Sequence, residues 1–214
     1  MKQPHDNWGT YYDFVYEQTF GSFYSNLTIE TLNIINLILP KGTILDFGAG
    51  TGRLSFPLAE QGYQLIAVEK SIGMVNEFKR KLDGQNLEIE IDNCSISEYE
   101  NGKADLAIAL FTVLSYSICE DELSKNIENI CKHIITNGYF FFDLPNKVFF
   151  NAGRLTNIDT NTFRRLVELT SNNKNDIYTY TEQCSGIFNG QEFIYEDEFK
   201  IRYWEISTLD KLLS

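Results

Sequence analysis

A short apolar run followed at once by three alternating glycines is the feature that most constrains this chain. Residues 43–47 predict a buried strand, Gly48, Gly50 and Gly52 follow it, and a helical pattern begins near Gly52. Glycines at such a bend allow a sharp turn and leave no side chain between the backbone and a ligand. The backbone N–H groups at the start of the following helix then point at a ligand that lies above the end of the strand. The stretch predicts a strand, a turn and a helix arranged to receive a ligand.

Three interpretations of this turn remain open. A dinucleotide fold uses G-x-G-x-x-G, but the third glycine comes one residue early, Arg53 takes its place, and Asp46 precedes the turn. The second interpretation is a glycine-rich turn between strand and helix that binds no ligand. Third, L-D-x-G-x-G-x-G resembles motif I of the class I S-adenosylmethionine-dependent methyltransferases. This resemblance implies that the turn approaches the methionine half of the donor. The implied cofactor-binding residues here are Asp46, Gly48, Ala49, Gly50 and Arg53.

A second acidic position follows the next strand. Residues 64–68 predict that strand, and Glu69 ends it. A carboxylate at the end of a strand can accept hydrogen bonds from both ribose hydroxyls. The alternative is an exposed acid stabilised by the dipole of the next helix. Residues 68–74 resemble the second signature of the same family, which implies that Lys70 belongs to the site and that Met74 packs on the adenosine.

The third strand is predicted at residues 87–91, where apolar and charged residues alternate strictly, as in a half-exposed edge strand. This suits the third strand of a sheet with the order 3-2-1-4-5. In the family an Asp often follows this strand and binds the adenine amino group. Counting back from the next strand displaces Asp92 and favours Asn93, Cys94 and Ser95 for that contact.

Residues 104–111 form a continuous apolar run, as expected of a central parallel strand. The loop at 111–116 has neither the [D/N]-P-P-[Y/F] motif of DNA and glutamine amino-methyltransferases nor a Pro-Cys nucleophile. It resembles the loop of small-molecule N-methyltransferases, including those that act on nucleotide-linked amino sugars. The resemblance implies that Phe111 contacts the cofactor and that Tyr116 and Asp143 contact the acceptor as catalytic candidates. For Asp143 the alternative is a strand-end acid that caps a neighbouring loop.

Helices are expected where apolar residues recur at helical spacing between capping residues. The first is expected at residues 25–39, with Ser25 as its cap and Pro40 as its stop, and the second at 53–61, bent or shortened by Pro57 and closed by Gly62. A third begins after Ser71. A fourth spans 120–135 and is terminated by Asn137-Gly138, and a fifth spans 208–213, with Ser207 as its cap. Residues 139–142 predict the fifth strand.

Residues 8–24 contain eight aromatic side chains. They predict either a helical face that packs on the domain or a lid of rings, since aromatic faces attract cations such as a sulfonium. Tyr12 is expected to cover the site, and rings near Tyr16 to contact the acceptor. His5 in a mobile terminus and His133 near a helix end are both expected to be solvated, so no general base is identified.

The pattern changes after Asp143. Residues 146–175 are polar and irregular, whereas 176–188 and 191–204 alternate and predict a hairpin around Asn189-Gly190. Residues 204–213 match the end of an antiparallel excursion in small-amine methyltransferases, which continue into strands six and seven. Either the chain is truncated, which we favour, or the hairpin supplies these strands. The hairpin is expected to pack outside the main sheet and to leave the edge of strand five open.

Composition narrows the possible partners. A net charge of −12 over 214 residues disfavours a nucleic-acid partner, because such affinity rests on Lys and Arg. Four scattered cysteines without a C-x-x-C pair argue against a metal cage or a disulfide framework and predict a reducing cytoplasm. No apolar leader or run of roughly 18 apolar residues is present, so no membrane partner is expected.

These features predict a doubly wound α/β fold with a mostly parallel, Rossmann-like sheet, a hairpin excursion after strand five, and the last two strands missing. Residues 1–145 are expected to form an N-terminal cap and the core, 146–206 a lid or homodimerisation element, and 207–214 the start of a terminal helix. The resemblance implies that the cofactor is S-adenosylmethionine and that a small-molecule acceptor is methylated on nitrogen. The alternatives are an O-methyltransferase and a non-catalytic domain that binds the donor or a partner.

Overall fold

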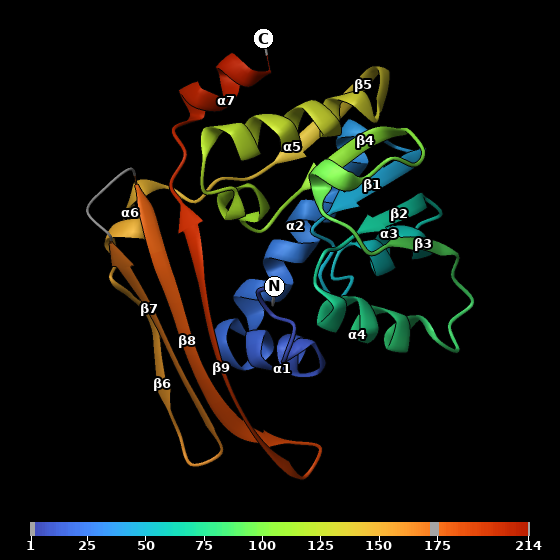
Figure 1. The fold of residues 1–214 in the computed structure, drawn as a ribbon. Helices are drawn as coiled ribbons and strands as arrows, with labels where there is room; N and C mark the ends of the chain where they lie inside the picture. Colours follow the sequence, from blue (N-terminus) through green and yellow to red (C-terminus); the bar gives the residue numbers. More distant parts are fainter. Residues whose placement is uncertain (1–2, 172–175, 214) are drawn as a thin grey trace.

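Two sheets of different construction make up the fold (Figure 1). The computed structural model describes residues 3–171 and 176–213. The parallel sheet has the strand order β3-β2-β1-β4-β5, and the antiparallel sheet has the order β6-β7-β8-β9. The strands are β1 (Thr43–Phe47), β2 (Gln64–Val68), β3 (Ile89–Asp92), β4 (Ala104–Ala109), β5 (Ile134–Phe142), β6 (Arg154–Asp159), β7 (Phe163–Ser171), β8 (Ile177–Phe188) and β9 (Gln191–Arg202). The helices are α1 (Gly9–Phe20), α2 (Ser22–Ile38), α3 (Ser55–Glu60), α4 (Ile72–Leu82), α5 (Glu120–Lys132), α6 (Lys147–Asn151) and α7 (Ile206–Leu212), with 3-10 turns η1 (Ile96–Glu98) and η2 (Val113–Tyr116).

The central strands β1 and β4 are buried on both faces of the parallel sheet, which explains their continuous apolar sequences. On one face, Leu45 and Ala107 pack with Ile127 of α5 and Leu209 of α7. On the other face, the side chains of β1 and β4 meet Ile35 of α2. The predicted strand order is confirmed. In the described part of the chain, β5 pairs with β4 alone and forms an edge.

Several predicted helix ends are wrong for local reasons. The helix α5 ends at Lys132, and the chain enters β5 at Ile134. Asn137-Gly138 therefore lies inside a strand, at a shift of register against β4. Asn137 has a left-handed φ of 66° there, and a Cβ on Gly138 would stand 2.7 Å from the carbonyl oxygen of Asp105. The dipeptide relieves crowding in a strand instead of ending a helix.

The other corrections concern helix starts. The helix α2 begins at Ser22, after a left-handed Gly21, and not at Ser25. The helix α3 begins at Ser55, which places Pro57 in the first turn, where a missing N–H breaks no helical hydrogen bond. The helix α7 begins at Ile206, with Glu205 and not Ser207 at the N-cap.

The region expected to be irregular contains α6, β6 and β7, so the excursion is a four-stranded sheet and not only a hairpin. On β7 the buried positions alternate, but one of them is Arg165, which breaks the apolar pattern. Its guanidinium Nε donates to a buried carboxylate oxygen of Glu182 on β8, at 2.8 Å. The predicted turn is confirmed, since Asn189 and Gly190 both have positive φ.

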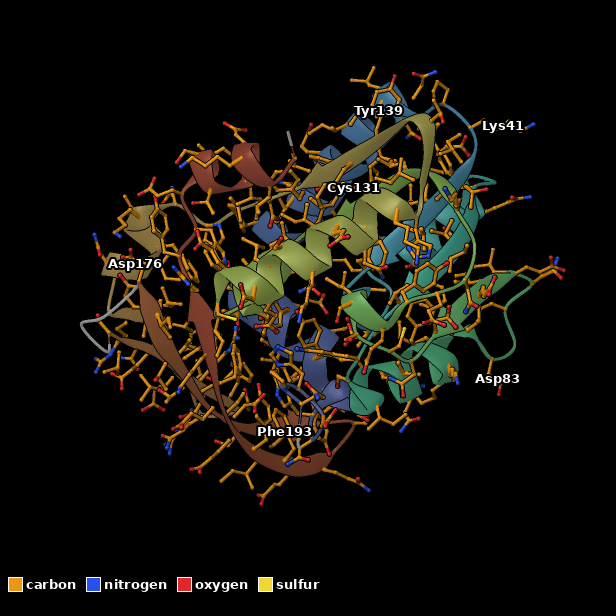
Figure 2. The ribbon with its side chains drawn as sticks, turned by 45° about the horizontal axis from the view of Figure 1, so that its top comes forward. Lys41, Asp83, Cys131, Tyr139, Asp176 and Phe193 are labelled. Carbon is orange, nitrogen blue, oxygen red and sulfur yellow. The ribbon has the colours of Figure 1, made fainter. Side chains whose placement is uncertain are left out.

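The antiparallel sheet lies outside the parallel sheet, as predicted, and curves around α1 (Figure 1). Trp8 and Tyr16 share a buried cluster with Phe193 and Tyr195 of β9. Figure 2 shows Phe193 and Asp176 at opposite ends of this sheet. The N-terminal segment is thereby held between the two sheets. None of the helices in the described residues is long and apolar enough to cross a bilayer.

Candidate cofactor and acceptor site

One cavity lies at the carboxyl ends of the parallel strands, where side chains from neighbouring strands meet. Most of the residues that the sequence singled out line it: Tyr12, Asp46, Gly48, Ala49, Gly50, Arg53, Glu69, Lys70, Met74, Cys94, Ser95, Phe111 and Tyr116. The structure adds residues that sequence reasoning missed: Pro4, His5, Tyr24, Ser117, Glu122 and Asn126. The cavity therefore joins the strand ends to the N-terminal segment and the start of α5.

The glycine turn is fastened to the end of β2. The backbone N–H groups of Gly48 and Ala49 both donate to the carbonyl of Val68, at 2.8 and 3.3 Å. Gly48 has a φ of 71°, and a Cβ there would stand 2.5 Å from a methyl carbon of Val113. A Cβ on Gly50 would meet nothing within 4 Å, so the backbone at this position faces open space. The turn therefore presents bare backbone to the cavity.

Glu69 connects the glycine turn to the start of α4. Its Oε2 accepts the N–H of Gly50 at 2.9 Å, and its Oε1 accepts the N–H of Ser71 at 2.8 Å. Burial raises the pKa of this carboxyl group, and the two backbone donors partly oppose that rise. Each carboxylate oxygen has about two acceptor positions, so both can accept a further hydrogen bond. Ser71 caps α4 as predicted, since its Oγ accepts from Met74 N at 3.3 Å.

Asp46 lies beneath the turn. Its side chain is buried, and its Oδ2 accepts a hydrogen bond from Ser55 Oγ at 2.6 Å. Burial raises the pKa of Asp46 to about 6, because a charge is poorly solvated there and one hydroxyl does not compensate. The carboxyl group changes its charge near neutral pH at the base of the cavity.

Arg53 forms part of the wall. Its guanidinium lies 5.3 Å from the ring centroid of Tyr24 and 5.2 Å from that of Phe111, within cation–π range. Its Nη1 also donates to Thr28 Oγ1 at 3.0 Å. The arginine thus links α2 to the glycine turn and to the loop after β4.

Two predicted site residues do not line the cavity. Asn93 Nδ2 donates to the carbonyl oxygens of Glu69 and Lys70, at 2.8 and 3.2 Å. The carboxylate of Asp143 accepts the N–H groups of Phe111 and Thr112, both at 2.7 Å. These two residues are left-handed, with φ near 68°, and Asp143 holds them so. In the structure, Asp143 therefore caps the loop after β4, and the side chain of Asn93 binds backbone carbonyl groups.

The expectation that both histidines are solvated is wrong. The side chain of His5 is only 14% exposed, and its Nε2 lies 2.8 Å from the hydroxyl of Tyr116. Its backbone N–H donates to Oδ2 of Asp197 at 2.8 Å. His133 is buried, with Nδ1 2.8 Å from the carbonyl oxygen of Asn129. The partners of His5 lie far away in the sequence, so the residues next to His5 could not predict these contacts.

Residues 4–8, here called the N-terminal strap, are pressed against the start of α4. Asp6 Oδ1 accepts a hydrogen bond from Ser71 Oγ at 2.8 Å. A Cβ on Gly73 would stand 2.1 Å from the carbonyl oxygen of Asp6, and one on Gly9 would stand 2.4 Å from that of Gly73. Two glycines therefore allow the strap to lie directly over the edge of the cavity.

The aromatic segment packs on the antiparallel sheet, as one alternative predicted, and some of its rings also line the cavity. Tyr12 stacks on Tyr16 with ring centroids 4.3 Å apart, and Trp8 stacks on Tyr195 at the same separation. Tyr116 stacks on Phe199 of β9 at 5.3 Å. Burial raises the pKa values of Tyr12 and Tyr116 well above their usual value, so both phenols are neutral at physiological pH. The segment packs on the antiparallel sheet and also turns rings towards the cavity.

Comparisons with known proteins show which proteins this chain resembles. Residues 44–138 match the family model described as a methyltransferase domain. A ubiquinone biosynthesis O-methyltransferase of Rickettsia akari (strain Hartford) is 27% identical over 112 residues, which are 52% of this chain and 43% of that protein. The chain spans about half the length of the curated relatives it matches.

Two solved structures establish the likeness of fold. One is an S-adenosylmethionine-dependent methyltransferase from Clostridium acetobutylicum ATCC 824, with 20% identity, 95% of this chain and 85% of that chain covered, and a TM-score of 0.79. The other is a sugar N-methyltransferase from Streptoalloteichus sp. ATCC 53650, with 15% identity, 94% and 82% coverage, and a TM-score of 0.74. At these identities the agreement concerns architecture, including the antiparallel excursion.

Proposed function

We propose that the chain transfers the methyl group of S-adenosylmethionine to a nitrogen atom of a small-molecule acceptor. Residues 44–138 match the methyltransferase domain model, and the fold resembles that of an S-adenosylmethionine-dependent methyltransferase, which supports the proposal. The observation that carries the proposal is the position of Glu69. Its carboxylate joins the bare backbone of the glycine turn to the start of α4 and keeps free acceptor positions. An adenosyl ribose presents the paired hydroxyls that such a carboxylate binds.

The residues of the cavity fit the donor in kind. Glu69 would hold the ribose, Met74, Cys94 and Ser95 would line the adenine, and the backbone from Gly48 to Gly50 would face the methionine half. When bound, S-adenosylmethionine supplies an electrophilic methyl group on a sulfonium, so the protein need only align the partners and exclude water. The strap and Tyr12 cover the cavity and serve that exclusion.

A nitrogen acceptor is favoured by the surroundings of Tyr116. Rings of Tyr12 and Phe199 lie near the N-terminal strap, and Asp197 stands behind it. Burial alone would raise the pKa of Asp197, but hydrogen bonds from His5 and Trp8 outweigh this and lower it, so the group is charged. The rings of Tyr12, Tyr24 and Tyr116 line the cavity, and aromatic rings attract an ammonium group. The sugar N-methyltransferase with the same fold makes amino sugars the first acceptors to test.

Calorimetric titration of the full chain with S-adenosylmethionine tests the first half of the proposal, with ATP as a matched control that carries ribose and adenine but no sulfonium. We expect saturable binding of the donor. Incubation with methyl-labelled donor then tests transfer to a panel of amino sugars, simple amines and phenols. Transfer to phenols alone would replace nitrogen by oxygen as the target. Binding without transfer would support the non-catalytic alternative, and no binding would overturn the proposal.

A further inference from the structure

We propose that Tyr116, His5 and Asp197 form a chain that removes the proton from the acceptor amine. This inference rests on the proposed function and adds a proton route to it. Tyr116 and His5 both line the cavity, and Asp197 lies behind them. Tyr116 would touch the acceptor, and His5 and Asp197 would act through it as positioning residues. The three come from η2, from the strap and from β9, so only the folded chain brings them together.

The contacts run in one line. The hydroxyl of Tyr116 lies 2.8 Å from His5 Nε2, and His5 Nδ1 lies 3.4 Å from Asp197 Oδ2. Nδ1 is buried and has no hydrogen-bond partner within the described residues, so this carboxylate is the acceptor it faces. Because the carboxylate of Asp197 is ionised, it can accept hydrogen bonds but cannot donate one. The proton of a neutral His5 therefore belongs on Nδ1, and Nε2 is left free to accept from Tyr116.

Asp197 also fixes the position of the strap. Its Oδ2 accepts the backbone N–H of His5 at 2.8 Å and the indole N–H of Trp8 at 3.1 Å. The ring of Phe199 stands 5.1 Å from the imidazole, at a steep angle. These contacts hold the imidazole at Tyr116 and leave it little freedom to turn.

The proton transfers balance. An acceptor ammonium loses one N–H proton to the phenolic oxygen of Tyr116, while the phenolic proton moves to Nε2 of His5. The electron pair left on nitrogen forms the new bond to carbon as the bond from that carbon to sulfur breaks. His5 is left as an imidazolium beside Asp197 and later loses one proton to solvent. Tyr116 never has to persist as a phenolate, which its burial disfavours.

Charged and titratable groups from several elements surround His5. They are Asp197 on β9, Tyr116 on η2, Tyr12 on α1, and Glu69 and Lys70 after β2. The Lys70 ammonium lies 5.6 Å from the ring centroid of Tyr116, on the cavity side. An imidazolium has no free ring nitrogen and could not accept the proton of Tyr116. The route therefore operates only when His5 is neutral.

A first experiment does not depend on turnover. The chain has two histidines, so nitrogen-15 labelling gives two imidazoles in an NMR spectrum, and His133→Gln identifies His5. If that variant does not fold, the signal lost in His5→Gln identifies it instead. We expect neutral His5 to carry its proton on Nδ1 and the Nε2 signal to move in Tyr116→Phe. A proton on Nε2 would overturn the chain, because His5 would then donate to Tyr116.

A second experiment measures rates against pH with the most active amine of the panel. His5→Gln keeps a polar side chain that cannot take a proton, so we expect kcat to fall about 100-fold at pH 7. The loss should shrink at higher pH, where the amine loses its own proton, while affinity for S-adenosylmethionine stays within about twofold. An equal loss at every pH, or none, would overturn the inference. His133→Gln should keep the pH profile of the unmodified chain.

The two experiments separate the possible failures. If the unmodified chain binds no donor and methylates nothing, the proposed function fails, whatever the tautomer of His5. If it methylates an amine while His5→Gln keeps a normal pH profile, only the proton route fails. Asp197→Asn should keep donor binding and lower kcat about tenfold, with the Nδ1 proton of His5 redistributed between the two ring nitrogens.

Discussion

The two sides of the cavity are assembled in opposite ways. The side that we propose for the donor comes from the ends of adjacent strands, and its central contact joins Glu69 to Gly50 and Ser71, all within one β–α–β segment. The other side joins His5 to Tyr116 and Asp197, across nearly the whole sequence. Local contacts follow from a motif, whereas the distant ones depend on how the antiparallel sheet curves around α1. Under the proposed function, donor binding and acceptor choice would be carried by separate parts of the molecule.

The two regions also bury charge differently. In the parallel region, Asp46 has a single hydroxyl as its side-chain partner and its pKa rises to about 6. In the antiparallel region, Arg165 and Glu182 form a fully buried ion pair, and Tyr195 donates to the same carboxylate at 2.7 Å. Burial of Asp46 thus raises its pKa, whereas burial of Glu182 is compensated by the ion pair with Arg165. Substitutions at these positions test the contrast.

The largest effect is expected from Glu182→Ala. The substitution leaves the guanidinium of Arg165 buried without its partner, which costs about 3–5 kcal/mol of unfolding free energy. Urea unfolding measures the loss. The matched control is Asp159→Ala in the exposed pair with Arg164, which should cost at most about 1 kcal/mol. Equal losses in the two variants would mean that the buried pair does not hold the antiparallel sheet.

Asp46→Asn should change the pH dependence of stability. The folded pKa of about 6 exceeds the ordinary value of 3.8, so between these values the folded state binds more protons than the unfolded state. The contribution of this group is full below pH 4 and is lost as the pH rises to 6, by about 3 kcal/mol. Urea unfolding of both proteins from pH 4 to 7 should show the stability of the unmodified chain falling relative to the variant. A constant difference would contradict the raised pKa.

Glu69→Ala should weaken the binding of S-adenosylmethionine about tenfold or more, as expected for the loss of charged hydrogen bonds. Calorimetry measures the change, and Glu90→Ala on the exposed face of β3 is the control. Glu69→Gln should bind with intermediate affinity because it keeps one acceptor. Unchanged affinity in Glu69→Ala would remove this residue from the donor side.

The smallest effect is expected from Asn93→Ala. Its amide braces the carbonyl oxygens of Glu69 and Lys70 and does not face the cavity. Donor affinity should therefore fall only about two- to threefold, through a small displacement of Glu69. A loss as large as that of Glu69→Ala would return Asn93 to direct contact with the donor.

The glycine turn and the place of Glu69 could be predicted from the sequence because they belong to one β–α–β segment. The strand order could be predicted through the family resemblance. The sequence was misleading at Asn137-Gly138, where a strand needs the left-handed backbone that usually ends a helix. The strand β7 was hidden because the partner that makes Arg165 a core residue lies on the next strand. His5 could not be predicted, since nothing beside it in the chain distinguishes it from a solvated terminal histidine.

The close approach of Gly9 and Gly73 limits which substitutions these two positions can tolerate. Neither position has room for even a methyl group unless the backbone around Asp6 moves away from α4. A mutation at one of them would displace the imidazole without touching it. Descendants of this chain that keep His5 in place are therefore expected to keep both glycines, so that two distant codons evolve as a linked pair.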